Sequence, residues 1–219
     1  VCSSDLALLQ LDHNPVAVKP FLRETFTYYS NLYVRIWQGA RAFSAEYSCV
    51  FYNSLNELDT QFMLILAACQ LDDPNETEKI ALVSRQLDRF FTLLQLQNSY
   101  DSNQIITELF LVAKDIRDQS IEAITPAFDR HLQAILAQRR ADTVTKSFQW
   151  GYFRNTSIVA LNKRFIRYYF ARIDDFLADG MKVSAKHLIQ DLVSKSGPVT
   201  GFHVEHILSH NAENRELFG

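Results

Sequence analysis

The scarcity of glycine and proline is the feature that most constrains how this chain folds. Its 219 residues include only 6 Gly and 5 Pro. A β sandwich needs a turn roughly every 8–12 residues, and those turns draw heavily on these two residue types. Hydrophobic residues make up 47% of the sequence, which is enough for one large or two small packed domains. We therefore expect a mainly α fold, a multi-helix array.

Apolar residues recur three or four positions apart in several segments, which is the spacing of amphipathic helices. The weakly periodic residues 142–156 are predicted to form a connection. Helices are predicted over residues 19–38, 55–71, from the cap Asn75 through Leu94, from Ser102 or Asn103 to 117, from Thr125-Pro126 to 140, 158–177, and 185–194 after the cap Ser184.

Two of these helices have the clearest apolar stripes. The helix from Asn75 through Leu94 also has a predicted capping box, with Asn75 as N-cap and Glu78 three residues later. The helix over residues 158–177 is predicted to end at Asp179-Gly180. The stripe of the first is Ile80, Val83, Leu87, Phe90, Phe91 and Leu94, and that of the second is Ile158, Leu161, Phe165, Ile166, Tyr169, Phe170, Ile173, Phe176 and Leu177.

Positive charge is concentrated in one region although the formal net charge is only −3. From Arg139 to Arg172 there are eight Lys or Arg residues against a single acid, Asp142. Lys163 and Arg167 are four residues apart on a predicted helix, so both can reach one track of phosphates, and Arg164 lies beside them. These three are candidate nucleic-acid-binding residues. The alternative is an ordinary solvated helix face.

Glu205 and His206 near the end of the chain are the candidate catalytic pair. Hydrolysis of a phosphodiester requires a base for water, and a neutral imidazole provides one near pH 7. It also requires a cation to meet the developing charge, and a carboxylate binds a hard divalent cation. His203 and His210 are close by, but without cysteines their spacing fits no standard zinc site.

The segment Val204-Glu205-His206-Ile207-Leu208 resembles the (D/E)-H-I-x-P opening of HNH, or ββα-metal, nucleases. Residues 202–218 resemble the C-terminal nuclease region of the GmrSD-type modification-dependent restriction endonucleases, and residues 162–173 are similar to the helix that precedes that site. The resemblance implies His206 as general base and Glu205 as a ligand of Mg²⁺ or a similar divalent metal. One departure is Ser209, where the family has Pro.

The same resemblance implies a larger parent protein, a cytoplasmic prokaryotic endonuclease of restriction or phage defence that acts on DNA. Nucleotide binding would belong only to an N-terminal domain of that parent, which is not in this sequence. We expect residues 7–197 to be a helical domain and residues 198–219 the beginning of an incomplete HNH-like nuclease domain, inactive alone. Val1 to Leu6 equal the translation of a common sequencing adapter and are interpreted as an artefact, with a genuine hexapeptide as the alternative.

A second function class is kept open: a non-catalytic helical interaction or scaffold domain with a degenerate nuclease tail. Other chemistry has little support. The scattered cysteines Cys2, Cys49 and Cys69 suggest neither disulfides nor a zinc site, and no apolar run reaches the roughly 18 residues that span a bilayer. There is no nucleophile elbow and no phosphate-binding glycine loop. His131 and His187 are predicted to be surface or satisfied structural residues.

Overall fold

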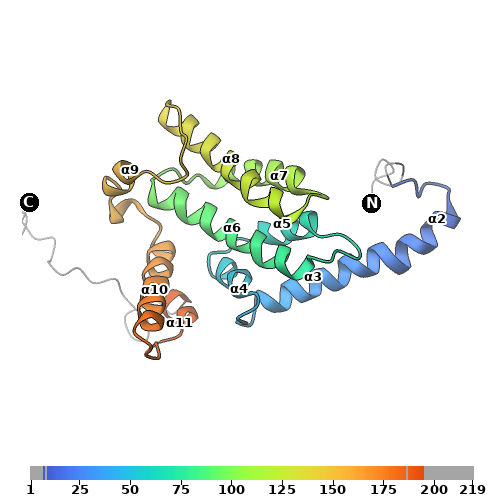
Figure 1. Ribbon diagram of the computed structural model, residues 1–219, viewed down its shortest axis with the longest axis horizontal. Helices are drawn as coiled ribbons and strands as arrows, with labels where there is room; N and C mark the ends of the chain where they lie inside the picture. The colour runs from blue at the N-terminus through green and yellow to red at the C-terminus, as the bar shows by residue number, and fades with distance from the viewer. Residues whose placement is uncertain (1–6, 8, 186, 195–219) are drawn as a thin grey trace, which may run out of the picture. The chain divides into compact units, whose positions relative to one another are not determined.

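The computed structural model describes residues 7, 9–185 and 187–194 and divides the chain into two compact units, Val1–Arg154 and Asn155–Gly219 (Figure 1). The described residues form helices and no strand, which confirms the mainly α prediction. The predicted HNH-like segment, residues 198–219, lies outside the described residues.

The first helical stretch of unit 1 runs through α2 (Pro15–Pro20), the π-helical segment η1 (Phe21–Phe26) and α3 (Thr27–Gly39). Asn14 caps it by accepting a hydrogen bond from the Ala17 amide at 3.2 Å. Pro20 has no amide hydrogen to donate, and the wider π-helical turns begin directly after it. The helix predicted over residues 19–38 is confirmed.

The helix predicted over residues 55–71 is wrong in its bounds. The structure has α4 (Ser48–Leu55) and α5 (Thr60–Ala68), separated by a turn. Glu57 adopts a left-handed backbone with φ of 59°, and the Leu58 amide donates to the Asn53 carbonyl at 3.0 Å. This turn allows the apolar residues of both helices to face the core, so two short buried helices stand where one was expected.

Three long helices complete the core of unit 1: α6 (Glu76–Leu96), α7 (Ser102–Ile116) and α8 (Ile121–Arg140). Helix α6 packs against α4, α5 and α8, and α7 packs against α5 and α8 (Figure 1). Phe90 of α6 meets Phe128 of α8 edge to face, with ring centroids 6.1 Å apart. The whole predicted stripe of α6 is buried.

The structure corrects one predicted capping box and one predicted helix start. Asn75 makes no side-chain capping bond, so the capping box with Glu78 does not form. Helix α8 begins at Ile121 and not at Thr125-Pro126, and Pro126 lies inside it. The Thr125 hydroxyl instead accepts a hydrogen bond from Gln86 Nε2 at 3.1 Å, which joins α8 to α6.

The end of unit 1 and unit 2 consist of shorter elements around one long helix. The predicted connection over residues 142–156 contains the short helix α9 (Trp150–Arg154). In unit 2, η2 (Ile158–Ala160) precedes α10 (Lys163–Gly180), which packs against α11 (Ile189–Ser194). Helix α10 ends at Gly180 as predicted, but it begins at Lys163 and not at Ile158, because Ile158–Ala160 form the separate 3-10 turn η2. Helix α11 starts five residues after the expected cap Ser184. Among the described residues, no helix is long and apolar enough to cross a membrane.

Candidate functional site

The predicted catalytic residue His206 and the predicted metal ligand Glu205 lie outside the residues that the structure describes. Within residues 7, 9–185 and 187–194 there is no group of three or more His, Cys, Asp and Glu side chains that could hold a metal ion. The predicted nucleic-acid-binding residues are described, and all three lie on α10.

The first turn of α10 carries two of these residues, Lys163 and Arg164. Asn162 caps the helix, and its side chain accepts hydrogen bonds from the amides of Arg164 at 2.8 Å and Phe165 at 3.4 Å. The turn contains no acidic residue, Lys163 is exposed and Arg164 is half-buried. Since a helix N-terminus already carries partial positive charge, two cations here create a positive potential that suits an anion.

Arg167, one turn further along, has an intramolecular contact. Its Nε donates to the carbonyl of Val193 at 3.1 Å, which ties α10 to α11. Arg172 is engaged within α10 itself, because its guanidinium donates to the Tyr168 hydroxyl at 2.6 Å. On the predicted basic face, Lys163 is therefore exposed in the first turn, whereas Arg167 also ties α10 to α11.

A histidine between two carboxylates joins α7 to α8 in unit 1. His131 Nδ1 lies 2.5 Å from Glu108 Oε1, and its Nε2 lies 2.8 Å from Asp115 Oδ2. Arg130 also reaches Asp115 at 2.5 Å. Hydrogen bonds from His131 and Arg130 hold the pKa of Asp115 below its ordinary value.

Both nitrogens of the His131 ring face carboxylates, so the ring has no nitrogen directed toward a substrate proton. The cluster is thus an electrostatic link between helices, and the prediction of a satisfied structural histidine is confirmed. Glu108 and Asp115 are seven residues apart and share a helix face, which was the available sequence signal. Their partner is 16 to 23 residues away and could not be assigned from spacing.

A buried lysine occupies the start of α6. Lys79 Nζ pairs with Asp73 Oδ2 at 2.7 Å and donates to the Ala68 carbonyl at 3.0 Å, and the two charged side chains are 3% and 2% exposed. Burial alone would raise the pKa of Asp73, but hydrogen bonds from Lys79 and the Asn75 amide lower it below its ordinary value. Burial, with the charges of Glu76 and Asp73, raises the pKa of the neighbouring Cys69 thiol to about 12. A protonated, buried thiol is a poor nucleophile.

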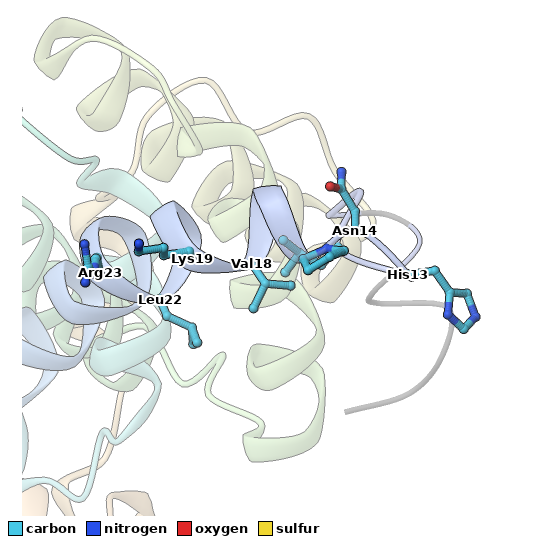
Figure 2. A pocket seen from close by; sticks show the side chains of 8 residues that line it. His13, Asn14, Val18, Lys19, Leu22 and Arg23 are labelled. Carbon is cyan, nitrogen blue, oxygen red and sulfur yellow. The ribbon is translucent and has the colours of Figure 1, made fainter.

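A hollow of about 720 Å³ lies along α2 and η1 (Figure 2). Figure 2 shows its labelled side chains spread along one helix and the preceding turn, with the His13 ring pointing away from the others. The described residues that line the hollow do not bring an acid, a base and a nucleophile together. Its lining residues are Leu11, His13, Asn14, Pro15, Val18, Lys19, Leu22 and Arg23.

Comparisons of the chain with protein-family models, with curated proteins and with solved structures find no match.

Proposed function

We propose that this chain is the helical part of a prokaryotic DNA endonuclease of restriction or phage defence, and that the first turn of α10 contacts the phosphate backbone. The observation that carries the proposal is the positive first turn, in which Lys163 and Arg164 add to the helix N-terminus with no acid among them. The Glu205-His206 pair, which resembles a nuclease motif, follows in the same chain.

In this proposal each residue has a separate task. Lys163 and Arg164 attract and orient the DNA backbone, since each phosphate they neutralise releases a counterion. The His206 imidazole takes a proton from the attacking water. The oxygen donors of Glu205 suit Mg²⁺ or a similar ion, which when bound would neutralise charge at the phosphate.

DNA binding by α10 is tested with the double variant Lys163→Ala/Arg164→Ala. Fluorescence anisotropy with a DNA duplex in EDTA separates binding from cleavage. We expect about tenfold weaker binding. The slope of log affinity against log salt concentration should become shallower by the amount expected for roughly two lost phosphate contacts. Arg167 is left intact because its loss would also loosen α11.

The matched control is Lys19→Ala/Arg23→Ala, which removes two exposed, helical positive charges from unit 1. The control should keep the affinity and the salt slope of the unchanged protein. Equal weakening by both double variants would mean that only the total charge matters, and it would remove α10 from the interface.

The catalytic assignment is tested in the parent protein with His206→Ala. Metal-dependent cleavage of DNA should be lost while duplex binding in EDTA is unchanged, because the imidazole is proposed to act on water and not on the backbone. Retained cleavage would exclude His206 as the general base.

A second function, a helical interaction domain without catalysis, is favoured by exposed apolar residues in the middle and at the end of α10. Phe176 is 76% exposed and Leu177 and Phe170 are also exposed, which is unusual for large apolar side chains gathered on one helix. This function predicts no cleavage by the parent protein with any divalent metal. Cleavage that depends on His206 would exclude it.

A further inference from the structure

Three exposed aromatic residues lie within five positions at the end of unit 1, in the loop before α9 and in α9 itself. Phe148 is 40% exposed, Trp150 64% and Tyr152 37%. The half-buried ring of Phe153 lies against two of them, with centroids 5.7 Å from Phe148 and 5.3 Å from Trp150. We call Phe148, Trp150, Tyr152 and Phe153 the aromatic platform. Exposure of so much aromatic surface is unfavourable in water, so a partner that covers it would gain binding energy.

The backbone beneath the platform is held by one buried side chain. Gln97, 3% exposed, donates from Nε2 to the Ser147 carbonyl at 2.9 Å, and its Oε1 accepts from the Gln149 amide at 3.0 Å. The Ser147 hydroxyl also donates to Asp129 at 2.8 Å. These bonds bracket Phe148 on both sides. The backbone on both sides of Phe148 is therefore fixed by contacts within unit 1, so a ligand need not order this part of the loop first.

The surroundings of the platform are positively charged. Residues 143–154 contain no acid, and their two cations, Lys146 and Arg154, are both exposed. Arg140 stacks on the Tyr152 ring, with its guanidinium carbon 3.5 Å from the ring centroid. The adjacent Asp142 carboxylate accepts a hydrogen bond from the Thr143 amide at 2.7 Å. The platform therefore combines π faces with cations at either end of the loop.

We propose that the aromatic platform binds unpaired nucleotides of single-stranded nucleic acid. Bases stack on Trp150 and Phe148, while Lys146 and Arg154 pair with phosphates. A flat π face binds any base and requires that the base be unstacked from a duplex, and the cations follow the backbone. The proposal goes beyond the duplex contact assigned to α10, because it rests on different residues in a different unit.

Binding is measured with a short oligothymidylate in EDTA, using the fluorescence of Trp150. The chain has two tryptophans, so Trp37→Phe leaves Trp150 as the only one. Oligothymidylate should quench this emission in a saturable way. The variant Trp150→Ala should bind oligothymidylate roughly tenfold to hundredfold more weakly, the range expected for one lost stacking contact. Its affinity is measured by the anisotropy of a labelled oligothymidylate.

The matched control is Phe110→Ala, which removes another exposed aromatic ring, 58% exposed on α7. It should leave oligothymidylate affinity unchanged. Lys146→Ala/Arg154→Ala should weaken binding about tenfold and flatten its dependence on salt. Circular dichroism confirms that each variant keeps its helices.

Three results would each overturn the proposal: no saturable quenching, unchanged affinity in Trp150→Ala, or an equal loss in Phe110→Ala. Competition by a DNA duplex as strong as that by oligothymidylate would do so as well, since a duplex offers no unstacked base. The duplex contact of α10 is judged separately. Loss of duplex binding in Lys163→Ala/Arg164→Ala with intact oligothymidylate binding would support both proposals.

Discussion

Helices α6 and α10 have the two clearest apolar stripes in the sequence, yet the two stripes differ in how far they are buried. Every member of the α6 stripe is 5% exposed or less. On α10, Phe165 and Ile166 are buried, whereas Phe170, Phe176 and Leu177 are exposed. The same spacing thus produces a helix in both places but a fully buried stripe in only one.

The difference follows from what each helix packs against. Helix α6 contacts α4, α5 and α8, and these together surround its apolar face. Within unit 2, α10 packs against the six-residue α11, which covers a short part of its length. The covered face of α10 also includes Tyr168 and Ala171, so it is shifted from the predicted stripe. In these two regions periodicity therefore predicts a helix, and neighbours decide how much of it is buried.

The largest expected effect tests the buried stripe of α6. Phe90→Ala removes a ring that is packed against Phe128, and it leaves a cavity in a core that cannot fully close. We expect a loss of about 3–5 kcal/mol in the free energy of unfolding of unit 1, measured by urea denaturation. A loss below about 1 kcal/mol would mean that the core of unit 1 is loosely packed.

An intermediate effect tests the polar anchors of the two helices. Lys79→Ala leaves the Asp73 carboxylate buried without its cation, which should cost about 3 kcal/mol. Arg167→Ala removes one hydrogen bond of a half-buried side chain to Val193, which should cost about 1 kcal/mol. Equal costs from urea denaturation would show that the anchor of α10 is as buried as that of α6.

The Lys79 anchor also has a pH dependence whose sign is fixed by Asp73. The pKa of Asp73 is lowered in the folded chain. The stabilising contribution of this carboxylate is therefore present above its unfolded pKa of about 3.9 and is lost as the pH falls through its folded pKa. Stability should therefore fall on acidification below about pH 4. In Lys79→Ala this fall should be smaller, because the cation that lowers the pKa is gone. An identical fall in both proteins would contradict the assignment.

The smallest effect tests the exposed end of α10. Phe176→Ser should change the free energy of unfolding of unit 2 by no more than about 0.5 kcal/mol, because the ring is 76% exposed. The measurement is thermal unfolding followed by circular dichroism. A loss above about 1 kcal/mol would show that another part of the protein covers this face in solution.

Much of the fold could be predicted from local sequence patterns, and the predictions that failed did so because of tertiary contacts. The helix ends near Arg140 and Gly180 were predicted correctly because breaks in periodicity and a turn residue mark them. Thr125 was wrongly taken as a cap because its hydroxyl could equally serve the contact with Gln86. Asn75 is the N-cap residue of α6 as predicted, but the capping box with Glu78 was wrong, because the backbone amide of Asn75 donates to Asp73 instead.

The candidate sites show the same division. The adjacent cations Lys163 and Arg164 were visible in the sequence, but their place in the first turn of α10 was not, because the helix was predicted to begin at Ile158. The contact of Arg167 with Val193 could not be predicted from the sequence, because the two residues are 26 positions apart. The aromatic platform was also missed. Phe148 and Trp150 alternate in a loop whose conformation depends on Gln97, a distant residue.

By itself, the sequence determined that the fold is mainly helical, roughly where most helices form, and where positive charge and the Glu205-His206 pair lie along the chain. These properties depend on residues within one or two turns of each other, and backbone geometry relates them directly. Only the tertiary structure decided which apolar faces are covered and which ionic groups meet, as in the pairs Lys79–Asp73 and His131–Glu108. Those outcomes depend on how the connections bring separate helices together, and helical periodicity carries no information about that.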